Sequence, residues 1–337
     1  MIVTILVLGF LFGAILQHAN LNRYNVISGM ATLENFAVAK AIAVAIGVGA
    51  ILIAIEIGLG FASYHLKPLI LGGIVFGGVL FGIGMAILGY CPGTLPVSLG
   101  EGSIDALAGI AGGLVGGLVY TILLPSIQPI LGPDLGSISL FTLIGQNHFA
   151  FYFINTVVGA VFVWIAFMLH KKEKATDYKW LYAGIGLAIL NAVVFLTVVS
   201  DRPIGASTAY PYVADFLTGI TQNNYFTKIQ VPGNWELLFL TGAFISGIVV
   251  SVLRKEFKIT IVHRNWARYK GNSVSKRLVW SFIGGFILII GARMAGGCTS
   301  GHVLSGGMQL SISSLLYACF VFGGLLITGK YFYRGRN

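Results

Sequence analysis

The chain alternates long apolar runs with short polar connections. A helix needs about 20 residues to cross the hydrocarbon core of a membrane, whereas the strands of a membrane barrel are about 10 residues long and alternate in polarity. The apolar runs match the first length, so the pattern predicts an all-α integral membrane protein with about nine transmembrane helices. The predicted spans are 1–20, 36–58, 69–90, 104–124, 149–169, 181–199, 235–254, 278–297 and 310–329.

Composition supports the same fold class. Hydrophobic residues make up 56% of the chain, charged residues make up 9%, and the mean hydropathy is +0.88. No water-soluble domain needs such a composition for its core. The first run lacks a basic amino-terminal region and a small-residue cleavage site, so we interpret it as a span and not as a secretion signal. Three cysteines do not make a disulfide framework, and reduced thiols are expected.

The net charge of +10 is distributed unevenly along the chain. Basic residues cluster at 171–179, 254–277 and 330–336, whereas the connections 125–148 and 200–234 hold only Arg202 and Lys228. The positive-inside rule then places the amino terminus outside and the carboxyl terminus in the cytoplasm. Lys67 is an exception, because it falls on the outer side. Clustering beside the spans argues against nucleic-acid binding.

Two stretches of the chain, 81–102 and 286–307, are similar to each other. Each is a glycine-rich apolar helix that leads into a cysteine, a polar turn and a further apolar span, and Cys91 and Cys298 occupy the same place in both. A single connecting span separates two four-span units, so the units enter the membrane from opposite faces as inverted-topology repeats. We predict a first repeat at 1–148, a connecting span with a basic loop at 149–180, and a second repeat at 181–337.

Both cysteines lie in glycine-rich segments at membrane depth. Non-helical backbone is tolerated there only when it is buried in protein or lines a watery cavity, since unpaired backbone groups are costly in lipid. The helix after each segment presents free N–H groups with partial positive charge. We therefore expect two central re-entrant cysteine loops that face a pore and favour an anion.

The duplicated cysteines are the strongest candidates for chemistry. A lone cysteine on an apolar face usually packs as a small hydrophobe, which is our interpretation of Cys319, but duplication favours a function for Cys91 and Cys298. No CxxC or HxxxH spacing indicates a metal site. A thiol–disulfide enzyme stays open as an alternative. Because a thiol is soft and polarizable, it distinguishes a sulfur-bearing ligand from a hard oxyanion such as sulfate.

Polar residues near the loops are further candidates for substrate contact. Arg293 lies within an apolar helix, where it either attracts an anion, snorkels outward or pairs with a carbonyl. His302 either bonds a loop carbonyl, which is the role we favour, or shuttles a proton or reaches the substrate. Glu101 either caps a helix or faces the path. The predicted substrate-binding residues are Cys91, Cys298, Asn22, Arg293, Thr94, Thr299, His302, Gln17 and Glu101. No phosphate loop, dinucleotide fingerprint or catalytic triad occurs, so no cofactor, metal or catalytic residue is predicted.

Four short motifs resemble the YeeE/YedE family of bacterial sulfur-compound transporters, and the similarity extends over nearly the whole chain. The motifs are GYCPGT (89–94), GEG (100–102), RPIGAST (202–208) and AGGCTSGH (295–302). The resemblance implies nine spans in a pseudo-twofold, hourglass-shaped fold that takes up thiosulfate, with Cys91 and Cys298 passing the ion along through S–H···S contacts. The thiosulfate transporters of the family carry a further pore cysteine just after the first span, and the matching position here is Asn22.

These features predict a permease and not an enzyme. Its expected activity is inward transport of a small sulfur-containing anion, with thiosulfate as the first choice. The alternatives are persulfide, sulfide or a selenium compound as substrate, a membrane thiol oxidoreductase or sulfurtransferase, and an assembly subunit without conduction. Besides membrane lipid, the expected partner is a cytoplasmic sulfur-carrier protein that docks on the basic segment 254–277.

Overall fold

The computed structural model of the protein describes residues 1–143, 148–173 and 176–334. These residues form helices and connections, and within them no β-strand occurs. The helices are α1 (Ile2–His18), α2 (Tyr24–Ala31), α3 (Ala37–Gly58), α4 (Leu71–Leu88), α5 (Thr94–Gly100), α6 (Ile104–Leu131), α7 (Leu140–Leu143), α8 (His148–Glu173), α9 (Lys179–Phe195), α10 (Ala209–Thr218), α11 (Asn224–Leu253), α12 (Arg264–Lys270), α13 (Val274–Met294), the π-helix η1 (Thr299–Gly306) and α14 (Ile312–Phe332).

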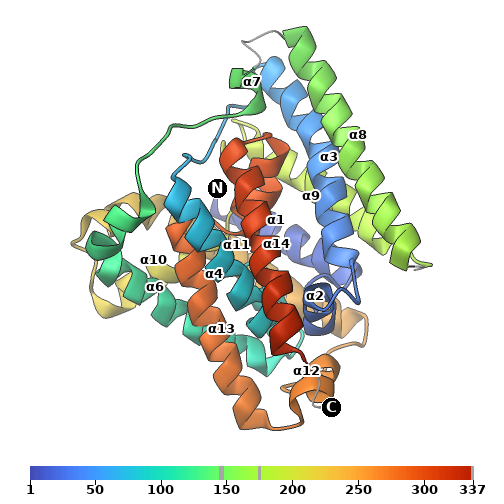
Figure 1. Cartoon of the computed structure of the whole chain (residues 1–337), viewed down its shortest axis with the longest axis vertical. Helices are drawn as coiled ribbons and strands as arrows, with labels where there is room; N and C mark the ends of the chain where they lie inside the picture. The colour runs from blue at the N-terminus through green and yellow to red at the C-terminus, as the bar shows by residue number, and fades with distance from the viewer. Residues whose placement is uncertain (144–147, 174–175, 335–337) are drawn as a thin grey trace.

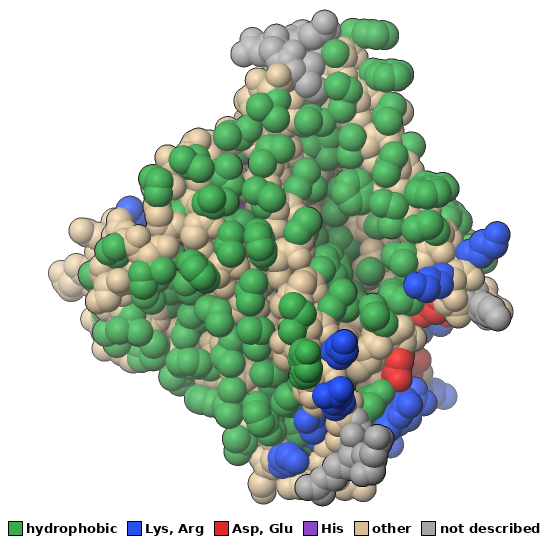
Figure 2. All heavy atoms as spheres, viewed as in Figure 1, with side chains coloured by type: hydrophobic (Ala, Val, Ile, Leu, Met, Phe, Trp, Pro, Cys, Tyr) green, Lys and Arg blue, Asp and Glu red, His purple; other side chains and the backbone are tan. Residues whose placement is uncertain are grey.

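Among the described residues, seven helices are long and apolar enough to cross a membrane: α3, α4, α6, α8, α11, α13 and α14. The other two predicted spans correspond to α1 and α9, which are apolar but only 17 residues long. Hydrophobic side chains cover most of the face in Figure 2, and most of the Lys and Arg side chains visible there gather at the end that carries α12 and the C-terminus. The protein is therefore a multi-pass membrane protein of the all-α class.

The predicted boundary of one span is wrong. The apolar run predicted a start at 235, but α11 begins at Asn224 and is 30 residues long. The Asn223 side chain caps it by accepting a hydrogen bond from the Phe226 N–H at 2.7 Å, and Pro232 lies inside the helix. Hydropathy registers only apolar stretches, so it misses a helix whose first turns are polar.

The long helices pack in pairs that correspond between the two halves of the chain. α1 packs along α11, and α9 packs along α3; α4 packs along α14, and α13 packs along α6. If α1 is exchanged with α9 and α3 with α11, the pair α1–α11 becomes the pair α9–α3. If α4 is exchanged with α13 and α6 with α14, the pair α4–α14 becomes the pair α13–α6. The central pair is α4 with α13, which lie side by side next to α14 (Figure 1).

Glycine allows these helices to approach closely. A Cβ atom at Gly112 of α6 would lie 1.9 Å from the Phe282 carbonyl oxygen of α13. Gly112→Val should therefore lower the free energy of unfolding by about 1–3 kcal/mol, because the backbones have to separate. Thermal unfolding in detergent measures the change. Gly323→Ala is the control, since nothing lies within 4 Å of a Cβ at Gly323; equal melting temperatures for the two variants would contradict this account of the packing.

Candidate functional site

The loop that carries Cys91 begins at a sharp turn after α4. Gly89 ends the helix in the left-handed conformation with φ +76°, and a Cβ there would lie 2.3 Å from the ring of Tyr24, so only glycine fits. The Cys91 N–H donates to Thr94 Oγ1 at 2.9 Å, and the same hydroxyl donates to the Cys91 carbonyl at 3.1 Å. Thr94 thus fixes the backbone of the cysteine at the start of α5.

The loop that carries Cys298 has a different conformation. α13 ends at Met294, Gly296 has φ +76°, and the chain continues from Cys298 into the π-helix η1. His302 holds this loop in place: its Nε2 donates to the Ala295 carbonyl at 2.8 Å, and its Nδ1 lies 3.0 Å from Ser314 Oγ on α14. Both ring nitrogens are therefore engaged in holding the loop, and π-helical turns are frequent at functional sites.

Cys298 lines a small polar cavity of about 30 Å³, called here the Cys298 cavity. The cavity lies between the connection from α3 to α4, the connection from α9 to α10, and the cysteine loop. Its charged and hydroxyl-bearing lining residues are Lys67, Arg202, Ser207, Thr208 and Glu236. The Cys298 side chain is 1% exposed, and its Sγ lies 3.1 Å from Ser300 Oγ.

Arg293 lies beside the same cavity and is 8% exposed. Its guanidinium donates to three hydroxyl groups: Tyr225 at 2.9 Å, Ser207 at 3.1 Å and Thr208 at 3.0 Å. Within the described part of the chain, no carboxylate forms an ion pair with Arg293. The side chain neither snorkels outward nor pairs with a carbonyl of the described residues, and its charge is held by hydroxyl groups and not by a direct ion pair.

Cations outnumber carboxylates around the Cys298 cavity. Arg202 Nη2 lies 3.6 Å from Glu236 Oε1, while Lys67 has no ion-pair partner among the described residues. Three cations (Lys67, Arg202 and Arg293) against the single carboxylate of Glu236 leave a formal charge of +2. Burial and the nearby Arg293 charge lower the pKa of Lys67. A bound anion would relieve this repulsion.

Cys91 lines a second, mostly apolar cavity of about 70 Å³, called here the Cys91 cavity. Thr94, Thr299 and Ser300 are its hydroxyl-bearing residues, and the Thr299 hydroxyl is buried without a hydrogen-bond partner among the described residues. Because Ser300 lines this cavity and also contacts Cys298 Sγ, it connects the two thiol sites. Leu16 and Leu21 line the opposite side, directly before Gln17 and Asn22 in the sequence.

Gln17, Asn22 and Glu101 lie beyond the Cys91 cavity. Asn22 is 0% exposed; its side-chain amide donates to Ser98 Oγ at 3.4 Å, and its Oδ1 is buried without a partner among the described residues. Gln17 Nε2 donates to Glu101 Oε1 at 3.0 Å. The structure thus brings these three predicted residues together at one end of α5, although Glu101 follows that helix and does not cap α6, whose N-cap residue is Ser103.

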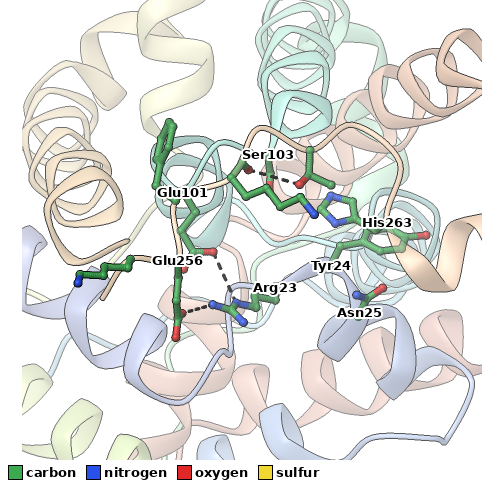
Figure 3. Close-up of a pocket in the computed structure, with 11 residues that line it drawn as sticks. Arg23, Tyr24, Asn25, Glu101, Ser103, Glu256 and His263 are labelled. Carbon is green, nitrogen blue, oxygen red and sulfur yellow. Dashed lines mark hydrogen bonds and ion pairs between the residues drawn. The ribbon is translucent and has the colours of Figure 1, made fainter. Parts of the chain in front are cut away.

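Glu101 also lines a vestibule of about 490 Å³ (Figure 3). Arg23 lies between Glu101, at 3.8 Å, and Glu256, with which it forms a close ion pair. Lys255, Lys258 and His263 come from the basic segment 254–277, so this segment forms one wall of the vestibule. The vestibule, the Cys91 cavity and the Cys298 cavity are three separate hollows, and none of the residues that line one of them lines another.

Sequence reasoning missed Lys67 and Arg202 as site residues. Each carried a signal, because Lys67 departed from the positive-inside pattern and Arg202 stood in a connection that otherwise held only Lys228. Neither signal identified Cys298 as the neighbour. The connections that bring them together are separated by more than a hundred residues, and only the fold joins them.

Fold and site define an integral membrane protein in which a helical bundle encloses two thiol-lined cavities, one of them with an excess of positive charge. The chain belongs to the Sulphur transport family, whose pattern matches residues 18–327, and this confirms the resemblance to the YeeE/YedE transporters. The chain is also 27% identical over 336 residues to "Thiosulfate transporter TsuA" of Spirochaeta thermophila, an alignment that covers 95% of this chain and 96% of that protein. The family and this relative indicate a transporter of a sulfur compound.

Proposed function

We propose that this protein carries thiosulfate inward across the bacterial inner membrane. Its amino terminus lies outside and its carboxyl terminus lies in the cytoplasm, beside the basic segment 254–277. Nine helices cross the membrane, with the short α1 and α9 completing two inverted repeats at 1–148 and 181–337. The helix α8 joins the repeats, and the loops of Cys91 and Cys298 re-enter the membrane from opposite faces.

The packing of the helices supports the inverted repeats. Exchanging the corresponding helices of the two halves preserves the pattern of contacts, and the central pair α4 and α13 is exchanged with itself. A pseudo-twofold axis in the membrane plane produces this relation, and it places both cysteine loops near the middle of the molecule.

The observation that carries the proposal is the surroundings of Cys298. A soft thiol shares a buried cavity with two cations and one carboxylate, and a third cation, Arg293, bonds to two hydroxyl groups of its lining. The formal charge of +2 matches a divalent anion that also bears an exposed sulfur atom. Removal of water from an ion costs many kcal/mol in a low dielectric, so fixed charges and hydroxyl groups have to replace its hydration. The thiol then distinguishes thiosulfate from sulfate, since it contacts a sulfur atom and not a hard oxygen.

Transport proceeds in steps along the cavities. The anion binds beside Lys67, Arg202 and Arg293 and contacts Cys298. It passes Ser300 into the Cys91 cavity, where Thr299 offers an uncommitted hydroxyl. It leaves past Asn22 into the vestibule, and a cytoplasmic sulfur-carrier protein docks there on the exposed Lys255 and Lys258 of the basic segment.

Uptake of radiolabelled thiosulfate, sulfate and sulfide into proteoliposomes tests this function. The wild type should take up thiosulfate faster than sulfate without an electron donor. Asn22→Cys should raise the ratio of thiosulfate to sulfate uptake roughly 2–10-fold, the range expected for one additional hydrogen bond, because it adds a soft donor to the exit path. Asn22→Ser is the matched control and should leave the ratio unchanged, since its hydroxyl is hard.

Two outcomes would overturn the proposal. Equal uptake of sulfate and thiosulfate would remove the role of the thiols in selectivity. Accumulation of a stable disulfide between Cys91 and Cys298 during turnover, with no flux, would instead indicate a membrane thiol oxidoreductase.

A further inference from the structure

A buried ion pair lies behind the Cys91 loop, outside both thiol cavities. Arg277 of α13 and Asp105 of α6 are each 0% exposed. The guanidinium contacts Asp105 Oδ2 through Nε at 2.9 Å and through Nη2 at 2.6 Å. The pair joins two helices whose residues are separated by 172 positions in the chain.

Arg277 also binds the end of α4. Its Nη2 donates to the Leu88 carbonyl at 2.7 Å, and its Nη1 lies 3.3 Å from the Ile87 carbonyl. The last carbonyls of a helix lack intrahelical partners and carry partial negative charge, so a guanidinium is a suitable cap. Since Leu88 is three residues before Cys91, the cation fixes the point from which the cysteine loop departs. The rings of Tyr24 and Trp266 lie 4.2 and 4.8 Å from the guanidinium carbon and hold it from its sides.

Asp105 also binds the Cys91 loop directly. The hydroxyl of Tyr90, the residue next to Cys91, lies 3.2 Å from both carboxylate oxygens. His263 Nε2 lies 3.0 Å from Asp105 Oδ1 and 2.9 Å from the Tyr90 hydroxyl, and His263 also lines the vestibule. One cluster of side chains therefore connects His263, which lines the vestibule in Figure 3, to the residue before Cys91.

The corresponding loop of the other half is held by different bonds. His302 bonds to a backbone carbonyl and to Ser314. The Arg202–Glu236 ion pair lines the Cys298 cavity, but among the described residues no charged side chain bonds to the loop itself. A buried ion pair contributes little net stability compared with apolar packing, whereas removal of one partner is strongly unfavourable. An ion pair that bonds directly to the segment before Cys91 therefore indicates a requirement for precise position at that loop.

We propose that Arg277 and Asp105, with Tyr90 and His263, are positioning residues that hold Cys91 in register with the path to the vestibule. This role rests on the proposed function of Cys91 as a substrate-contacting thiol. Arg277 fixes the end of α4, and Asp105 fixes the residue before the cysteine. Displacement of either releases the loop and leaves the Cys298 cavity unchanged.

The rate at which a small thiol reagent modifies Cys91 in the purified full-length protein tests this role. Quantitative mass spectrometry of the Cys91 and Cys298 peptides gives both rates without reference to transport. Arg277→Gln should accelerate Cys91 modification by about tenfold, the factor that corresponds to loss of one strong hydrogen bond, and should leave the Cys298 rate unchanged. Arg268→Gln is the control, because its ion pair with Glu34 lies in the same basic segment but is exposed.

Tyr90→Phe is the second variant, because it removes one hydroxyl and leaves the ion pair intact. It should accelerate Cys91 modification severalfold even if Arg277→Gln fails to accumulate in membranes. Unchanged Cys91 rates in Tyr90→Phe and in any folded Arg277→Gln protein would overturn the proposal, as would equal acceleration of Cys298. Faster modification of Cys91 with normal thiosulfate uptake would support the positioning role and contradict the proposed function.

Discussion

Cys298→Ser is expected to reduce thiosulfate uptake roughly 10–100-fold, which corresponds to loss of a hydrogen bond with a charged partner. The substitution keeps the volume and the contact with Ser300 Oγ, so the cavity and its cations stay in place. What disappears is the soft atom, and a hydroxyl offers a hard group to the terminal sulfur of the substrate. Cys91→Ser should have an effect of the same size at the next step of the path.

Initial rates of radiolabelled uptake into proteoliposomes measure both losses. Cys319→Ser is the control, since Cys319 is exposed and lines neither thiol cavity. Sulfate uptake should fall less than thiosulfate uptake in the Cys298 variant. Normal thiosulfate uptake by both Cys298→Ser and Cys91→Ser would leave the thiols with a packing role only.

Arg293→Gln should have opposite effects on uptake and on stability. Uptake should fall roughly 100-fold at low substrate concentration, because the Cys298 cavity loses a buried cation that faces the anion. Thermal stability in substrate-free detergent should stay the same or rise, since no carboxylate in the described chain forms an ion pair with Arg293 and its removal relieves repulsion with the buried Lys67 charge. Arg293→Lys, which keeps the charge, should retain more uptake than Arg293→Gln.

Uptake as a function of thiosulfate concentration distinguishes binding from passage. A rise in the half-saturating concentration identifies Arg293 as a capture residue, and Arg264→Gln, at an exposed position of the basic segment, provides the control. A marked loss of thermal stability in Arg293→Gln would contradict this role, because it would mean that the three hydroxyl contacts serve the fold.

Several features of the fold could be predicted from local stretches of the sequence. Seven of the nine apolar runs correspond to helices long enough to cross a membrane, and the other two correspond to shorter apolar helices. Apolar runs predict membrane-spanning helices reliably, because each such helix has to be apolar along its own length to lie in lipid. The start of α11 was missed for the same reason, since its first residues are helical but polar.

The site residues were predictable to different degrees. Cys91 and Cys298 could be identified from the sequence alone, because they occupy the same place in two similar stretches. The bond from His302 to a loop carbonyl was also predicted. The separate cavities around the cysteines, the contact of Ser300 with Cys298 and the contact of His302 with Ser314 followed only from the structure.

By itself the sequence determined the membrane class, the helical runs and the two duplicated cysteines, because each depends on the composition or repetition of neighbouring residues. Only the tertiary structure decided which charges act together. Lys67 and Arg202 meet at the Cys298 cavity, and Arg277 and Asp105 meet behind the Cys91 loop. These groups lie on helices and connections far apart in the chain, and burial in a low dielectric makes their contacts strong only once packing has brought them together.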